Sequence, residues 1–288
     1  MFILTYDISF KELDEKIELL QINDIYNVYY ESPLEITTEE YGYGYLEKEV
    51  SNIDLKIAYD EDKNNIDLFV NKVNSLLNKN YKNLEEINEN YEVYDFPIVH
   101  INDNWVLASP DTIIDDKYTN KISFISQGAF GTGLHETTKD LLNVILTKLD
   151  LNNKSVLDIG TGSGILSIAS AIIGASNVTA LDIRDVKDEV ELNASLNGLY
   201  NINVVVGNAL NNEVTISEKF DWIYINIGGE ETEMFMPFIK EHLANNGKLL
   251  VSGLVEWSFD KVKSLIEDNG FTLNEKYQTN EWITATFY

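Results

Sequence analysis

The chain has 288 residues, of which 44% are hydrophobic, so it is long enough for one large domain or two ordinary ones. It contains no cysteine, which excludes disulfides, thiolate metal ligands and a cysteine nucleophile, and we expect no metal site. The net charge is −27, which repels nucleic acid and favours a basic protein partner, unless the acidic residues serve only solubility. With no apolar run as long as a membrane span and no signal-peptide pattern at Met1–Tyr6, we expect a cytoplasmic protein.

The first part of the chain is expected to fold in the order β-α-β-β-α-β, which is typical of a small ferredoxin-like α+β domain over residues 1–96. Ser9 is a candidate cap for the first helix, which is expected to run through Gln21. Residues 32–49 look irregular, with a surface turn at Tyr41–Tyr45. The domain has no catalytic constellation and is expected either to recognise a substrate or to be only structural. The strands are expected at 2–8, 25–30, 52–59 and 91–99, and the second helix at 66–77.

A connector is expected over residues 97–136. It contains three short strand patterns and then a loop with three glycines, Gly128, Gly131 and Gly133. Thr137 or Thr138 is expected to open a helix that ends at about Leu149. The strand patterns cover 98–101, 105–108 and 122–125.

Residues 137–288 alternate between strand and helix patterns, which predicts a doubly wound, mostly parallel α/β sheet. The last two strands have no helix between them and are expected to form a hairpin at the sheet edge. Strands are expected at 155–159, 178–183, 202–206, 221–227, 247–252, 271–278 and 281–287, and helices at 164–174, 185–196, 231–244 and 257–269.

The organising stretch is the glycine loop that follows the first of these strands. An apolar run ends in Asp158, and Gly160, Gly162 and Gly164 follow at alternate positions before a helix begins. Strand, glycine turn and helix N-terminus together form a nucleotide-binding crevice in α/β proteins. The G-x-G-x-G spacing looks like the S-adenosylmethionine (SAM) loop of class I methyltransferases, although a tight turn without a ligand has the same pattern.

Polar residues follow the next strands, where ligands bind in such sheets. Asp182 lies 22 residues after Gly160, close to the spacing of an acid that binds ribose hydroxyls. Its neighbour Arg184 is interpreted as a surface residue. Asn208 is a candidate for reading the adenine edge, or equally a turn residue. Asn226 ends an apolar strand beside the expected position of the reactive methyl group. There its side-chain oxygen can accept a hydrogen bond from an attacking amine. The alternative is a structural Asn whose side chain binds a local turn.

Several segments together resemble the bacterial family of ribosomal protein L11 methyltransferases, known as PrmA. The resemblance covers essentially the whole chain and is most specific in the loop that ends in His-x-Thr-Thr and in the Asn-Ile strand. The segments are Ala129-Phe-Gly-Thr-Gly-Leu-His-Glu-Thr-Thr138, Leu157–Leu166, Asn193-Ala-Ser-Leu-Asn-Gly198, Asp221–Ile227 and Ser252-Gly253-Leu254.

The resemblance implies a seven-stranded Rossmann-like class I methyltransferase sheet over residues 137–288. It implies SAM contacts at Thr138, Gly160, Asp182 and Asn226, and it places Phe130 near the methyl donor and the incoming amine. It also implies that the N-terminal domain binds the basic ribosomal protein L11, which is methylated on lysine side chains and its α-amine. Gly162 and Asn208 complete the candidate cofactor site, and a monomer is expected.

The chain departs from this family's pattern after Asn226, where Gly228-Gly229-Glu230-Glu231 replaces apolar and proline residues. The segment after Asp182 is about one residue shorter and has Arg184-Asp185 in place of Asp-Pro, and Glu136 stands where many members have proline. Since the first departure borders the amine site, two other functions stay open. One is methylation of a different protein lysine or a small-molecule amine, and the other is a non-catalytic SAM-binding regulator.

His135 and Glu136 are candidates to assist proton removal, although His135 is better interpreted as ordering its loop.

Overall fold

The structure is a computed structural model that describes residues 1–87 and 96–288. These residues form two compact units. The first holds Met1–Thr38 and the chain from Tyr43 up to the undescribed stretch. The second holds Glu39–Gly42 and the chain from residue 96 to Tyr288, and it contains every candidate site residue.

The first unit has a four-stranded antiparallel sheet in the order β2-β5-β1-β6, which is the ferredoxin-like arrangement expected from the sequence. Alternate residues of β1 and β5, such as the directly opposed pair Tyr6 and Leu55, face one apolar cluster with the two helices. The elements are β1 (Phe2–Ser9), α1 (Leu13–Ile22), β2 (Val28–Tyr29), β5 (Asn52–Tyr59), α2 (Ile66–Leu77) and β6 (Asn83–Glu86).

Three expectations for this unit are corrected. The stretch 32–49 is not irregular, because β3 (Leu34–Thr38) and β4 (Tyr43–Glu47) pair there as a hairpin. The fourth strand is β6, not residues 91–99; most of the expected strand lies outside the described residues, and only Val99 forms a strand, in another sheet. Ser9 makes no side-chain cap, and it precedes a short 3-10 turn, Phe10–Glu12, that leads into α1.

The expected strands of the connector form a three-stranded sheet. It contains β7 (Val99–His100), β8 (Trp105–Ala108) and β9 (Asn120–Ser123), with β8 in the middle. Phe124 and Ile122 are fully buried in the same core as the helix residues Leu141 and Ile168, so this sheet packs as part of the second unit. We keep the domain limits 1–96, 97–136 and 137–288 as a proposal.

The second unit is built on a seven-stranded sheet in the order β12-β11-β10-β13-β14-β16-β15. All neighbours are parallel except β16, which is antiparallel to both β14 and β15, so the expected terminal hairpin and the doubly wound α/β class are confirmed. The strands are β10 (Ser155–Ile159), β11 (Asn177–Asp182), β12 (Ile202–Val206), β13 (Phe220–Asn226), β14 (Leu243–Val255), β15 (Leu273–Thr279) and β16 (Trp282–Phe287).

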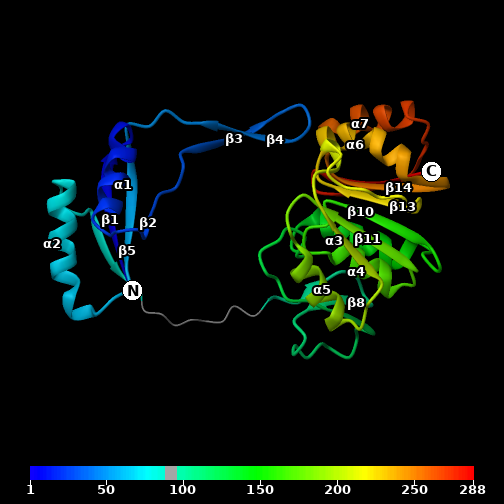
Figure 1. The fold of residues 1–288 in the computed structure, drawn as a ribbon, viewed down its shortest axis with the longest axis horizontal. Coiled ribbons are helices and arrows are strands. Elements are labelled where there is room, and N and C mark those ends of the chain that lie inside the picture. Colours follow the sequence, from blue (N-terminus) through cyan, green and yellow to red (C-terminus); the bar gives the residue numbers. More distant parts are fainter. Residues whose placement is uncertain (88–95) are drawn as a thin grey trace. The chain divides into compact units, whose positions relative to one another are not determined.

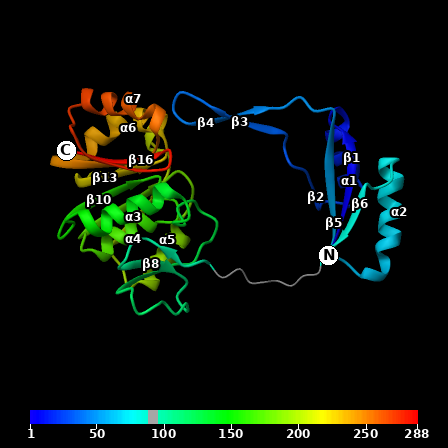
Figure 2. The ribbon, with the colours of Figure 1, turned by 180° about the vertical axis from the view of Figure 1, so that it is seen from behind.

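Helices cover both faces of this sheet. In Figures 1 and 2, α6 and α7 lie on one face, and α3, α4 and α5 lie on the other. The near-continuous apolar strands fit this arrangement because both faces are buried. The helices are α3 (Glu136–Lys148), α4 (Ile165–Ile172), α5 (Lys187–Leu196), α6 (Gly229–His242) and α7 (Glu256–Asp268). Within residues 1–87 and 96–288, no helix combines the length and apolarity needed to cross a membrane.

Candidate functional site

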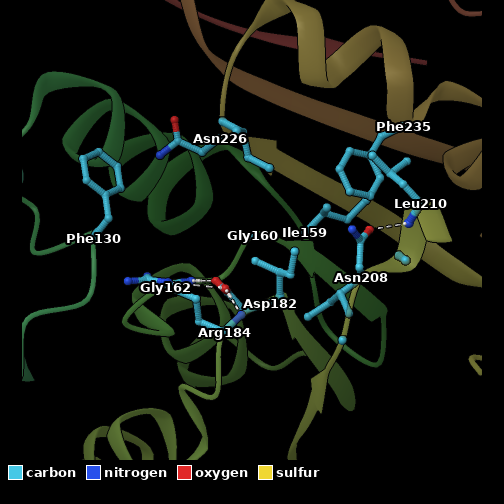
Figure 3. Close-up of a pocket in the computed structure, with 15 residues that line it drawn as sticks. Phe130, Ile159, Gly160, Gly162, Asp182, Arg184, Asn208, Leu210, Asn226 and Phe235 are labelled. Atoms are coloured by element: carbon cyan, nitrogen blue, oxygen red, sulfur yellow. Dashed lines mark hydrogen bonds and ion pairs between the residues drawn. The ribbon is translucent and has the colours of Figure 1, made fainter. Parts of the chain in front are cut away.

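A cavity of about 480 Å³ opens at the carboxyl ends of β10, β11, β12 and β13 (Figure 3). The chain winds outward in opposite directions from β10 and β13, so this is the point where strand order reverses and ligands bind in doubly wound sheets. The lining residues come from the four strand ends, from the segment before α3 and from α6. They are Phe130, Ile159, Gly160, Gly162, Leu181, Asp182, Ile183, Arg184, Gly207, Asn208, Ala209, Leu210, Asn226, Ile227 and Phe235.

The glycine loop forms one wall of the cavity, and two of its glycines leave no space for a side chain. A Cβ on Gly162 would collide with the carbonyl oxygen of Phe130, and one on Gly160 would lie 2.9 Å from the Ile227 side chain. Both residues also have φ in the left-handed region, at +69° and +54° for Gly160 and Gly162. The loop therefore presents bare backbone to the cavity.

Asp182 lies at the end of β11 and ties the glycine loop to the neighbouring turn. Its two carboxylate oxygens accept the backbone N–H of Gly162 and that of Arg184, each at 2.9 Å. The Arg184 guanidinium Nε lies 3.8 Å from one of these oxygens, and this side chain lines the cavity although it is more than half exposed. Arg184 is thus part of the cavity wall as well as of the surface.

Asp158 supports the loop from below without reaching the cavity. Its carboxylate is buried and accepts hydrogen bonds from the hydroxyls of Thr161 at 2.7 Å and Ser167 at 2.8 Å. Burial raises the pKa of Asp158 to about 6, against the lowering effect of these two hydroxyls. Through these two hydrogen bonds Asp158 links β10 to the glycine loop and to α4.

Asn226 faces the cavity from the end of β13 (Figure 3). Its side-chain amide has no hydrogen-bond partner in the described part of the chain, so the structure shows no local turn bound by this residue. The preceding residues of β13 from Trp222 to Ile225 are buried. A free amide at the end of an apolar strand is available for a ligand.

Asn208 has a structural use and also lines the cavity. Its side-chain oxygen accepts the backbone N–H of Leu210 at 3.0 Å and so caps the 3-10 turn Ala209–Asn211. This leaves the amide nitrogen as the group that remains for a ligand. Asn208 is therefore the turn residue that one interpretation of the sequence expected, and it also lies in the cavity wall.

Phe130 reaches the cavity from the loop before α3. Its carbonyl accepts the backbone N–H of Ser163 at 2.9 Å, and the carbonyl of Gly131 accepts the Ser163 hydroxyl at 2.8 Å. The phenyl ring is 56% exposed and stands across the cavity from Asp182 and Asn208 (Figure 3). The ring is therefore placed by backbone bonds to the glycine loop.

Thr138 is the predicted site residue that does not line the cavity. It lies buried in the first turn of α3, and its hydroxyl has no hydrogen-bond partner among the described residues. The helix begins at Glu136, one residue before the expected start, because His135 caps it by accepting the Thr137 N–H. This contact agrees with the interpretation that His135 orders its loop.

The structure brings together six of the seven predicted residues, namely Phe130, Gly160, Gly162, Asp182, Asn208 and Asn226. Sequence reasoning missed the apolar wall formed by Leu210 and Phe235, because only the sheet order brings the turn after β12 next to α6. Across residues 1–87 and 96–288, no group of three His, Asp or Glu side chains has the arrangement of a metal site.

A family model described as ribosomal protein L11 methyltransferase (PrmA) matches residues 40–288. The chain belongs to this family. A ribosomal protein L11 methyltransferase of Porphyromonas gingivalis is 34% identical over 202 residues, which cover 69% of this chain and 68% of the relative. One of Lactobacillus johnsonii is 38% identical over 156 residues, which cover 54% of this chain and 48% of that protein, so the chain spans about half the length of the first curated relatives it matches.

The crystal structure of a ribosomal protein L11 methylase from Lactobacillus delbrueckii subsp. bulgaricus is similar with a TM-score of 0.59 and 29% identity. The similarity covers 66% of this chain and 97% of that one. This agreement supports the class I methyltransferase fold of the second unit.

Proposed function

We propose that this chain is a SAM-dependent protein N-methyltransferase whose substrate is ribosomal protein L11. The observation that carries the proposal is the juxtaposition of Asp182 and the unpaired amide of Asn226 in one cavity beside the glycine loop. An acid at the end of the second strand suits ribose hydroxyls, and an amide acceptor at the end of the fourth suits an amine. Family membership supports the same reaction.

The described residues fit SAM. The cavity volume lies within the range of small-molecule sites. The Asp182 carboxylate would hold the ribose, the Asn208 amide nitrogen and the Leu210 and Phe235 side chains would hold the adenine, and the bare backbone at Gly160 and Gly162 would allow close approach. The buried, unpartnered Thr138 hydroxyl is a further polar group for the amino-acid part. When bound, SAM supplies an electrophilic methyl group on a sulfonium.

On the acceptor side, Asn226 would orient the amine by accepting one of its N–H bonds through the side-chain oxygen, while Phe130 excludes water. An ordinary lysine has a pKa of about 10.4, so presenting it neutral at pH 7 costs about 4–5 kcal/mol. A cavity wall of Phe130 and Ile227 disfavours the charged form of the amine. Positioning then supplies most of the acceleration, and the amine proton passes to solvent.

The first unit would recognise the protein substrate. The acidic chain, with a net charge of −27, complements a basic ribosomal protein and repels nucleic acid, so the free protein is favoured over a direct RNA contact. Such a reaction belongs to the cytoplasm, and the protein is proposed to act as a monomer.

The test is incubation with purified ribosomal protein L11 and methyl-labelled SAM, followed by mass spectrometry of the intact protein and its peptides. We expect mass increases of whole methyl groups on lysine or α-amine nitrogens, and their loss with Asn226→Ala. If a cell extract shows label on another protein or a small amine and none on L11, that molecule would be the substrate instead of L11. Calorimetric SAM binding without label in any fraction would instead indicate a regulator.

A further inference from the structure

The backbone of the segment between β9 and Phe130 is bound on one edge by a strand and on the other edge by side chains of a helix. Along one edge it continues the pairing with β8, since the Phe124 N–H donates to the Ala108 carbonyl at 3.0 Å. Among the residues that the structure describes, no strand pairs with its other edge, because β9 is the last strand of its sheet. An open strand edge leaves N–H and C=O groups that need partners. Here three side chains of α5 and its C-terminal cap supply them.

Two asparagines act as substitutes for peptide groups. The Asn197 amide accepts the Ser123 N–H at 2.9 Å and donates to the Ser123 carbonyl at 2.8 Å. Asn193, which is fully buried, makes the same pair with Ile125, at 2.8 Å from its N–H and 3.1 Å to its carbonyl. Each side chain thus satisfies both backbone groups of one residue, as a neighbouring strand would.

Glu189 completes the row at the end nearest Phe130. Its carboxylate oxygens accept the Gln127 N–H at 3.2 Å and the Ala129 N–H at 3.3 Å, and the side chain is buried. Positions 189, 193 and 197 lie four residues apart, which is about 6.0 Å along a helix. Positions 123, 125, 127 and 129 lie two residues apart, which is about 6.6 Å along an extended chain. The two repeats match closely enough for one helix face to bind four alternate residues.

The row ends where the cavity begins. Ala129, the last residue bound by α5, is buried, and the next residue is Phe130, whose carbonyl is bonded to Ser163 of the glycine loop. Gly164, at the far end of that loop, lies against Val190 of α5, since a Cβ there would meet the Val190 methyl groups at 2.8 Å. Helix α5 therefore positions both the glycine loop and the segment that carries Phe130.

We propose that Glu189, Asn193 and Asn197 are positioning residues for methyl transfer, which fix segment 123–129 on α5 and thereby set the place of Phe130 over the cavity. Glu189 is the deciding member because it binds the two amides next to Phe130. This inference rests on the proposed function. A small displacement of a positioned group is enough to slow a reaction greatly, so the effect falls on the methyl-transfer rate.

The test is Glu189→Gln, which keeps the shape of the side chain but turns one acceptor into an NH2 donor that faces a backbone N–H. We expect amide hydrogen exchange, followed by NMR, to accelerate at least about tenfold at whichever of Gln127 and Ala129 faces the new NH2 group, but not at Ser123 and Ile125. The turnover number for methyl transfer to ribosomal protein L11 should fall at least about tenfold. SAM affinity by calorimetry should change less than about threefold, because Asp182 and Phe235 are untouched.

Glu191→Gln is the matched control, since Glu191 lies on the same helix, is exposed and forms an ion pair with Lys187 at 3.7 Å on the helix surface. It should leave exchange and turnover unchanged. Gln127→Pro is a second variant, which removes one bonded N–H from the exposed side of the segment without altering α5. It should lower turnover in the same direction, and it serves if Glu189→Gln does not fold.

Three results would overturn the inference: unchanged exchange at Gln127 and Ala129 in Glu189→Gln, accelerated exchange with normal turnover, or an equal loss of turnover in Glu191→Gln. A wild-type protein that methylates no L11 would overturn the proposed function alone. The exchange pattern would then still decide whether α5 holds the segment.

Discussion

The backbone carbonyl of Phe130 lies directly against the Cα of Gly162, so that a Cβ at residue 162 would overlap the carbonyl oxygen. Two parts of the chain thirty-two residues apart thus share one wall of the cavity, and the Ser163 N–H bonds the same carbonyl. The contact is backbone on backbone, so no rotamer change relieves it.

Gly162→Ala is therefore expected to lower SAM affinity by at least about 100-fold and to destabilise the fold. Alanine at positive φ costs about 1–2 kcal/mol, and the collision with Phe130 adds to it. Gly198→Ala is the matched control, because Gly198 has φ +69° and nothing within 4 Å of an added Cβ. Calorimetry and thermal unfolding of both variants measure the difference; equal effects would show that strain alone matters.

Asn226→Ala is expected to lower the methyl-transfer rate by about 100-fold with little effect on stability. The side chain makes no hydrogen bond in the described part of the chain, so its removal leaves no protein group unpaired. The loss is comparable to that of one preorganised polar group at a reaction centre. Asn226→Asp keeps an oxygen acceptor and should retain more activity than the alanine variant. Rapid-mixing kinetics would contradict the assignment if Asn226→Ala turned over at the normal rate.

Asp182→Asn is expected to weaken SAM binding roughly 30-fold, about 2 kcal/mol, because hydrogen bonds to a charged group are worth more than those to a neutral one. The amide would also turn an NH2 group toward the N–H of Gly162 or Arg184. Asp185→Asn, three residues along and exposed, should bind SAM normally. Calorimetric titration of both variants distinguishes them, and normal binding by Asp182→Asn would remove this residue from the site.

The sequence predicted the parts of the site that depend on short-range pattern. Gly160, Gly162 and Asp182 follow from strand ends and spacing, and the parallel sheet brings such ends together. Phe235 carries no such signal, since it lies mid-helix and reaches the cavity only through the packing of α6. Likewise, Asn193 of α5 and its C-terminal cap Asn197 lie in a segment recognised by resemblance, but their bonds to Ile125 and Ser123 depend on tertiary structure.

The first unit shows where pattern reasoning fails. Strand β6 is the four-residue segment Asn83–Glu86, in which only Leu84 is apolar, so no alternation marks it. The hairpin of β3 and β4 exposes its apolar side chains Leu34, Ile36 and Tyr45, and therefore shows no contrast between a buried and a solvated face. Both were missed because the alternation signal requires a buried face.

The buried Asp158 predicts a pH dependence of stability. Its pKa rises from the ordinary 3.8 to about 6 in the folded protein, chiefly through burial. Well below pH 3.8 the carboxyl is protonated in both the folded and the unfolded chain and contributes nothing. Well above pH 6 it is ionised in both, and the folded state bears the full cost of the buried charge, roughly 3 kcal/mol. The contribution of Asp158 to the free energy of unfolding therefore falls as pH rises from 4 to 6.

Asp158→Asn removes this titration while retaining an oxygen that accepts from the hydroxyls of Thr161 and Ser167. We expect the stability of the variant relative to the wild type to increase by about 2–3 kcal/mol between pH 4 and pH 7. Urea unfolding of both proteins in the same buffers measures this difference and cancels the titration of the other carboxyl groups. A difference that stays constant with pH would show that the Asp158 carboxyl titrates alike in the folded and unfolded chain, and that its bonds to the two hydroxyls offset its burial.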